Sequence, residues 1–385
     1  MTIANGSQHS MSYIVESTYG TTPATPALTE LRHSSTTLGL SKSALESQEL
    51  RDDRQIKDYR HGVKSVGGDI GIEMSYGSHD DLLEAVLCGT WAAQVDSTAI
   101  TADAASGTFT RPSGSFLTDG FAQYDIVTSS GYVASGNNGR FLVTNAAALV
   151  LTVTPIEGQT MSVEVGGGDE QFIAEANLRT GVTRRSFTIE RKFADITQYL
   201  RFTGSSFNAM SMDVAPDAIV TATLGVIGKG QVTDTSIISG ATYPAGTTTV
   251  PFDSFTGEIR DNGTAIAVVT SININIDNGM NPLFVVGSAE TLEPSIARSR
   301  LTGSMEVYFE DTTILDKFID ETETTIQFTL TDPSGNDYIF YLPRVKYNSG
   351  QPDVTGEDPV MLTVDFVGIL DSASNTNIVI ERVPA

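Results

Sequence analysis

The sequence predicts an all-β protein with a few short helices, built as a β-sandwich or partial barrel. Three observations lead to this prediction. Apolar and polar residues alternate in many segments, the chain contains 35 glycines, and only 18% of its residues are charged. Such a composition is typical of short strands joined by many turns. With 385 residues, the chain is long enough for two or three domains that each bury a core.

A period of two identifies the strands, because alternate side chains of a strand point to opposite faces of a sheet. Between the strands lie short turn signals with Asn or Gly, which tolerate positive φ, and these predict hairpins. The apolar series are Ile70, Ile72, Met74 and Tyr76; Val220, Ala222, Leu224 and Val226; Ile272, Ile274 and Ile276; and Leu362, Val364 and Phe366. The turn signals are 137–139, 261–263, 277–279 and 332–335.

Three short helices are expected, because three apolar runs each follow residues that can cap a helix. Each could pack on a sheet. The predicted helices cover 82–87 after Ser78 and Asp81, 314–319 after Asp311, and about 196–202 between Asp195 and Gly204.

A strand followed by an acidic cap and an apolar helix occurs twice. The segment 68–74 precedes the first predicted helix, and 303–309 precedes the second. Two such units favour a duplicated fold, although chance within a repetitive β vocabulary is the alternative.

Residues 94–181 differ from their surroundings, since Ala, Ser, Thr and Gly are abundant there. Strands are expected around 121–128, 139–144 and 149–154, enough for a small sandwich or barrel. We therefore predict an inserted small β domain at 94–181. The main domain then has a first part at 1–93, with an N-terminal arm (1–30) and a charged loop, and a second part at 182–385.

Several function classes find little support. A net charge of −24 argues against a basic surface that grips DNA, and it is also what a merely soluble acidic protein would show. We expect no secretory signal at 1–10 and no membrane span. Cys88, the single cysteine, sits in an apolar run, where a buried thiol is expected.

Catalytic signatures are equally weak, so we predict a protein that is not an enzyme and has no cofactor. The four histidines are not spaced as zinc ligands, and the adjacent carboxylates at 52–53 and 80–81 point apart or start a helix. The glycine-rich segment 225–230 lacks the spacing of a phosphate-binding loop, and a turn explains it better.

The segment Lys42–Lys64 carries six positive and five negative charges. It is either a solvated loop or, as we prefer, an interface loop in which alternating charges set the register with a partner. Two arginines before the second repeated strand occupy the corresponding place. The interface candidates are Arg51, Asp52, Asp53, Arg54, Lys57, Asp58, Arg60, Arg298 and Arg300.

The order of these segments resembles the major tail tube proteins of long-tailed phages. The resemblance begins at Thr36–Leu40, continues through Gly67–Ile70 and Asp80–Leu87, and returns at Arg185–Arg191 and Phe207–Met212. It covers most of the chain outside the inserted stretch, which is similar to small β modules of tail proteins.

The resemblance implies a subunit of the virion tail that is made in the host cytoplasm and self-assembles into stacked hexameric rings. DNA would pass through an acidic lumen without specific binding. The partners implied in the same way are a tape-measure protein, tail-tip proteins and tail-terminator proteins, with the charged loop reaching the next ring and the arm ordering only on assembly.

Two other functions are compatible with parts of the sequence. An immunoglobulin-like surface adhesin or fibre module would also be all-β and non-catalytic, but the expected absence of a secretory signal counts against it. A carbohydrate-active enzyme would need carboxylates and aromatic residues in one cleft, and the chain has a single tryptophan, Trp91.

Overall fold

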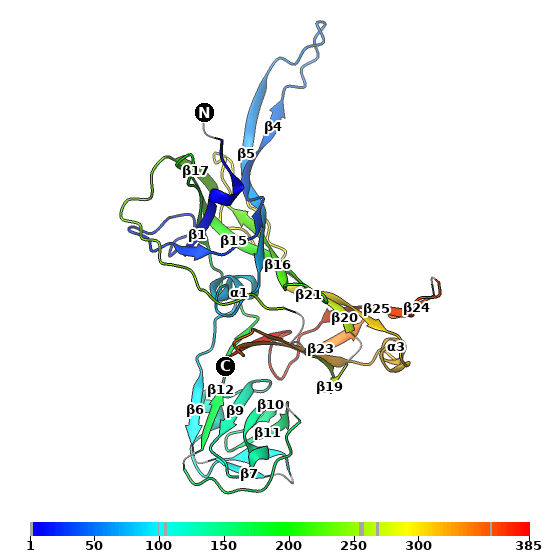
Figure 1. The fold of residues 1–385 in the computed structure, drawn as a ribbon. Coiled ribbons are helices and arrows are strands. Elements are labelled where there is room, and N and C mark those ends of the chain that lie inside the picture. The colour runs from blue at the N-terminus through cyan, green and yellow to red at the C-terminus, as the bar shows by residue number, and fades with distance from the viewer. Residues whose placement is uncertain are drawn as a thin grey trace. The chain divides into compact units, whose positions relative to one another are not determined.

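The computed structural model describes residues 3–98, 100–103, 106–156, 158–168, 170–253, 258–266, 269–354 and 356–385. It is dominated by strands, which confirms the predicted all-β class (Figure 1). The chain packs as two units. Unit 1 comprises 1–88, 182–252 and 271–303, and unit 2 comprises 89–181, 253–270 and 304–385. The domain organisation expected from the sequence stays a prediction.

Unit 1 is built on antiparallel strands that join the N-terminal segment to the middle of the chain. Along the sheet these are β2 (Thr29–Leu31), β1 (His9–Val15), β14 (Phe187–Phe193), β15 (Gln198–Val214), β16 (Thr221–Gly228), β5 (Tyr59–Glu73) and β4 (Gly39–Glu46). In addition, β3 (Ser35–Thr36) pairs with β5, while β17 (Gly230–Asp234) and β20 (Val269–Asp277) pair with opposite halves of β15.

The predicted alternation is confirmed in these strands. Ile70 and Ile72 of β5 are buried, and so are the alternate residues of β16 and β20 that the sequence pattern selected. Tyr76 lies beyond β5 and is only half-buried. The glycine-rich segment 225–230 is the end of β16 followed by a bend at Lys229 into β17, so it is a strand and turn.

Two of the three predicted helices form. The first, α1 (Asp80–Leu87), buries its apolar face, but its N-cap is His79 and no side chain caps it, so the predicted capping box is wrong. The second, α3 (Thr313–Ile319), begins after Asp311, whose Oδ1 accepts a hydrogen bond from the Thr313 N–H at 2.8 Å. Each follows a strand, β5 or β21 (Arg300–Tyr308), as the repeated pattern predicted.

The third predicted helix, at 196–202, is wrong. Residues 194–197 form the tight turn between β14 and β15, with Thr197 at a φ of 52°, and β15 begins at Gln198. The predicted capping residue Asp195 does bind a backbone group, since its Oδ2 accepts a hydrogen bond from the Asn5 N–H at 2.6 Å, but it caps no helix. The local signal was therefore that of a turn, and pairing with β14 decided in favour of a strand.

The N-terminal arm is ordered within the single chain, so the prediction that it orders only on assembly is wrong for 9–15 and 29–31. Both segments are strands of unit 1. The buried Glu16 carboxylate follows β1 and accepts hydrogen bonds from Gly20 N–H at 2.7 Å, Ser186 Oγ at 2.8 Å, Thr188 Oγ1 at 2.8 Å and Gly204 N–H at 2.9 Å. Residues 1 and 2 of the arm lie outside the described residues.

Unit 2 contains a sheet centred on β23 (Asp337–Tyr347). Its hairpins use turns that the sequence predicted: Asn262 and Gly263 have φ of 51° and 77°, and Gly335 has a φ of 92°. The other strands are β18 (Glu258–Asp261), β19 (Thr264–Ala265), β22 (Thr324–Thr331), β24 (Pro352–Asp353), β25 (Met361–Gly368), β26 (Val379–Val383) and β13 (Ala176–Arg179), and β21 pairs with β25.

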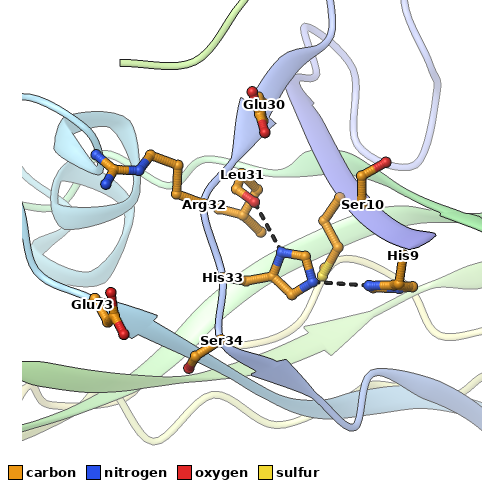
Figure 2. A pocket seen from close by; sticks show the side chains of 9 residues that line it. His9, Ser10, Glu30, Leu31, Arg32, His33, Ser34 and Glu73 are labelled. Atoms are coloured by element: carbon orange, nitrogen blue, oxygen red, sulfur yellow. Dashed lines mark hydrogen bonds between the residues drawn. The ribbon is translucent and has the colours of Figure 1, made fainter. Parts of the chain in front are cut away.

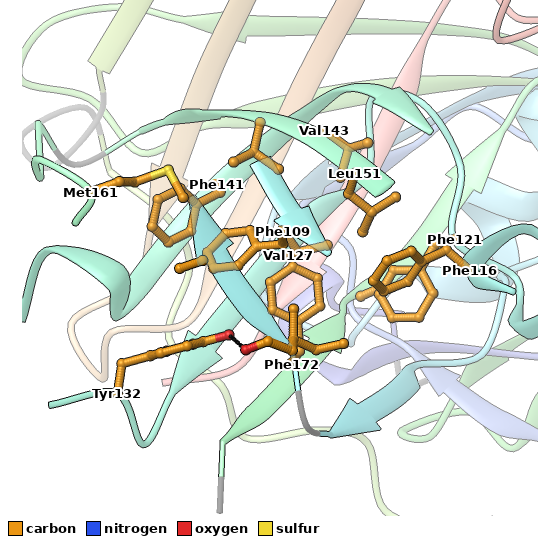
Figure 3. Close-up of a cluster of buried hydrophobic side chains, with 14 residues drawn as sticks. Phe109, Phe116, Phe121, Val127, Tyr132, Phe141, Val143, Leu151, Met161 and Phe172 are labelled. Carbon is orange, nitrogen blue, oxygen red and sulfur yellow. Dashed lines mark hydrogen bonds between the residues drawn. The ribbon is translucent and has the colours of Figure 1, made fainter. Parts of the chain in front are cut away.

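Unit 2 also contains a separate seven-stranded sheet with its own aromatic core. In order, the strands are β6 (Val95–Thr98), β12 (Gln171–Ala174), β9 (Ile126–Ser130), β10 (Gly139–Ala146), β11 (Val150–Pro155), β8 (Thr108–Thr110) and β7 (Thr101–Asp103). Five buried phenylalanines pack at its centre with α2 (Phe116–Asp119) (Figure 3). The strands predicted at 139–144 and 149–154 are confirmed, whereas the one predicted at 121–128 begins only at Ile126.

Candidate assembly interface

The charged segment Lys42–Lys64 forms most of a long hairpin made by β4 and β5. Its strands pair from Gly39 with Gly67 to Glu46 with Tyr59, with one register shift between Lys42 and Ala44. Residues 47–58 form the tip. Figure 1 shows the hairpin extending away from the other strands of unit 1. Residues 42–46 and 59–64 of the segment are therefore strand, whereas residues 47–58 form a loop, as the sequence predicted.

The outer part of this hairpin has no core of its own. Leu45, Leu50, Ile56 and Tyr59 expose 58%, 98%, 61% and 56% of their surface. A two-stranded hairpin without a packed face is at best marginally stable in water. Contact with another surface would therefore stabilise this part of the hairpin.

Most of the predicted charged residues pair with one another along the hairpin. Arg51 binds both oxygens of Asp53, with an Nη2–Oδ2 distance of 2.6 Å and an Nε–Oδ1 distance of 3.0 Å. This hydrogen bonding holds the pKa of Asp53 below its ordinary value. Further ion pairs join Lys57 to Glu49 at 2.7 Å and Arg60 to Asp58 at 2.6 Å. Such exposed pairs add little stability, so their main effect is to set a pattern of charge.

The remaining candidates occupy different places. Asp52 and Arg54 are exposed at the hairpin tip, where Arg54 has a φ of 58°. Arg298 and Arg300 are exposed just before and at the start of β21, away from the hairpin in sequence. Their role at an interface stays a prediction.

A contact that sequence reasoning missed lies at the root of the hairpin. The Lys64 N–H donates to the Ala289 carbonyl at 2.7 Å, and Lys64 Nζ lies 3.3 Å from Glu290 Oε1. The partners are more than 220 residues apart, so no local pattern indicates this contact.

A polar cavity of about 290 Å³ in unit 1 is lined by the two histidines His9 and His33 (Figure 2). Arg191 Nε donates to His9 Nε2 at 3.2 Å, and arginine can only donate. The His9 proton is therefore on Nδ1, which donates to His33 Nε2 at 2.9 Å, and His33 Nδ1 in turn donates to the Leu31 carbonyl at 3.1 Å.

These three hydrogen bonds use all four ring nitrogens and link β1 to β2 and β14. Burial, Arg191 and His33 lower the pKa of His9 to about 4, which keeps the ring neutral. Neither histidine has a nitrogen left for a metal or for proton transfer. We interpret His9 and His33 as structural residues that hold these strands together, and we call the pair the latch.

Other candidate chemistry gives a similar picture. Cys88 is buried, as predicted, and burial raises the pKa of its thiol. In the part of the chain that the structure describes, no group of three or more His, Cys, Asp or Glu side chains is placed to hold a metal ion. Helices long and apolar enough to cross a membrane are likewise not found among the described residues.

The comparison with protein families is decisive. The model of the family described as phage tail tube protein matches residues 6–368. The chain belongs to this family. No curated protein matches the sequence significantly.

The tail tube family match spans both units, including the seven-stranded sheet. It confirms the resemblance drawn from the order of the segments. The chain is thus a structural tail tube protein, a component of the virion tail that works in an oligomeric assembly.

Proposed function

We propose that this tail tube protein self-assembles into hexameric rings that stack through the β4–β5 hairpin, and that it has no catalytic role. The observation that carries the proposal is the hairpin, which extends from unit 1 and exposes apolar and charged residues on both of its faces. An interface with the next ring would bury these apolar side chains. The alternating ion pairs would fix its register.

The net charge supports a role in DNA conduction. Six copies at −24 carry about −144 per ring, and a lumen lined by part of this charge would repel phosphate. DNA could then slide during ejection without binding. The sheet inserted at 94–181 would face outward, and tape-measure, tail-tip and tail-terminator proteins would control the length and ends of the tube.

The experiment is to reverse the charges of Arg51 and Arg54 together by substitution with Glu. We expect the subunit to fold normally, with unchanged circular dichroism and melting temperature, because both side chains are exposed. Tubes or rings seen by negative-stain electron microscopy, with light scattering to follow their mass, should become rare. Normal tubes from this variant would contradict the stacking assignment.

A matched control is Arg344→Glu in unit 2. Arg344 also forms an exposed bidentate pair, with both Glu323 oxygens at 2.7 Å, so its reversal tests the general effect of losing such a pair. It should leave assembly intact. If the unsubstituted protein stays monomeric when concentrated, purified tail-tip complex is added as initiator. Monomers even then would contradict self-assembly into rings.

A further inference from the structure

An exposed apolar loop lies beside the hairpin in unit 1. We call Leu283, Phe284, Val285 and Val286 the apolar knob. Their side chains are exposed, and Val286 is as accessible as in an extended chain, at 107%. Runs of three or four consecutive exposed apolar residues are uncommon on soluble proteins unless they serve a binding function.

The knob is held in shape by hydrogen bonds at its base. Thr291 is buried, and its Oγ1 accepts the Leu283 N–H at 2.9 Å. The Leu292 N–H donates back to the Leu283 carbonyl at 2.8 Å, which closes the loop. At the tip, Ser288 N–H donates to the Val285 carbonyl at 3.2 Å across Gly287, whose φ of 93° suits glycine. The apolar residues are therefore presented by an ordered turn.

The knob is also fixed next to the hairpin. Its C-terminal side contacts Lys64 of β5 through Ala289 and Glu290, as described above. Further along, Arg184 donates to the Pro294 carbonyl at 3.2 Å and lies 3.4 Å from Glu293 Oε1. A molecule that covers the root of the hairpin from this side meets the knob as well.

We propose that the apolar knob packs against a second copy of this chain and extends the interface that the hairpin forms. The choice of a second copy follows from continuity with the hairpin and from membership in a family that works as an oligomer. This proposal about the knob rests on the proposed function. The hairpin would supply charge pattern and register together with its own apolar side chains, and the knob would add further apolar burial. Because the knob is already held in an ordered turn, its burial costs little ordering entropy.

The test replaces Phe284 and Val286 together by Ser in the full-length chain. The concentration at which half the protein assembles, measured by light scattering and sedimentation, should rise at least about tenfold. The melting temperature should fall only slightly, because Val286 is fully exposed and Phe284 does not belong to the buried core. The matched control is Val133→Ser in unit 2, whose side chain is 96% exposed and which should assemble like the unsubstituted protein.

A second readout follows burial directly. The substitution Val286→Cys adds a reactive thiol, while Cys88 is buried and serves as an internal reference. Labelling of the new thiol by a maleimide should slow at least about tenfold in the assembled state. Unchanged labelling in tubes would mean that no copy covers the knob.

The outcomes separate the two proposals. If the Arg51/Arg54 variant fails to assemble but the Phe284/Val286 variant assembles normally, the knob proposal is wrong and hairpin stacking stands. If the unsubstituted chain assembles only when a tail protein of different sequence is added, and the knob is buried only then, that protein is the occupant and a second copy is not. If the Arg51/Arg54 variant assembles normally, hairpin stacking is wrong, and the knob proposal then stands or falls on the Phe284/Val286 variant and on the labelling of Val286→Cys.

Discussion

Glu381 of β26 is fully buried in unit 2, and among the described residues no group makes a hydrogen bond of good geometry to its carboxylate oxygens, although the nearby Ile126 backbone acts to lower its pKa. Burial raises the pKa of Glu381 well above its ordinary value, and repulsion from Asp125 adds to this effect. Asp125 is itself paired with Arg179 at 2.6 Å, so that arginine is already engaged. We therefore expect Glu381 to be protonated in the folded protein.

The sign of the pH dependence follows from this shift. In the unfolded chain a glutamate ionises near pH 4.3, so above that pH folding takes up a proton. The stabilising contribution is complete below the unfolded pKa and is lost as the pH rises through the folded pKa. The loss is about 1.4 kcal/mol for each pH unit between these two values.

The substitution Glu381→Gln keeps the shape of the side chain and removes its titration. Above neutral pH we expect the variant to be more stable than the unsubstituted protein by about 1–3 kcal/mol, and this difference should shrink as the pH falls toward 5. Urea unfolding from pH 5 to 8.5 measures it. The single tryptophan, Trp91, reports on unit 2 because it lies 6.4 Å from the Tyr338 ring and 5.3 Å from the Arg382 guanidinium.

Glu323→Gln is the matched control for this prediction. Glu323 is an exposed glutamate of the same unit, paired with Arg344, and this pair lowers its pKa. Loss of this carboxylate should slightly lower the free energy of unfolding at a pH above the pKa of Glu323, which is opposite in sign to the effect expected for Glu381→Gln. Equal pH slopes for the unsubstituted protein and the Glu381→Gln variant would refute the conclusion that Glu381 is buried as the neutral acid.

Two further predictions concern the latch and the seven-stranded sheet. Because the pKa of His9 is lowered to about 4, stability should be lost as the pH falls from about 6.5 toward 4, by about 1–2 kcal/mol after allowance for partial exposure. The hydrogen-exchange protection factors of β1, which correct for the slower intrinsic exchange in acid, should fall over this range, and they should do so equally in His61→Gln, a change at an exposed histidine. Unaltered protection factors in acid would argue against the latch. In the seven-stranded sheet, the Cβ of Gly136→Ala would overlap the Thr160 carbonyl oxygen, so thermal melting should show that the free energy of unfolding falls by about 1–3 kcal/mol. Gly167→Ala is the control, because its Cβ lies 3.5 Å from a glutamate oxygen, an ordinary contact, and it should be nearly neutral. Equal melting of the two variants would contradict this close packing.

Much of the fold could be predicted because it depends on local patterns. The alternation at Ile70 and Ile72 and the turn at Asn262–Gly263 each reflect a restriction that the residues carry with them: a two-residue period and tolerance of positive φ. The failure at 196–202 has the same origin. A short capped segment satisfies both a helix and a hairpin turn, and only the neighbouring strand β14 decides between them.

The candidate interface was predictable in part. Alternating charge at Lys42–Lys64 identified the segment, but its strand pairing, its exposure on both faces and the ion pair of Arg51 with Asp53 required coordinates. The apolar knob was missed because its significance depends on exposure. Four apolar residues in sequence read equally well as part of a buried strand.

The sequence by itself determined the all-β class, most strands, two of the helices and the family, because composition, periodicity and segment order are properties of the chain in one dimension. Only the tertiary structure decided which distant residues meet. It placed Lys64 against Ala289, His9 against His33, and Glu381 near Asp125. These contacts join segments separated by many residues, and their energies depend on burial and geometry that no local pattern encodes.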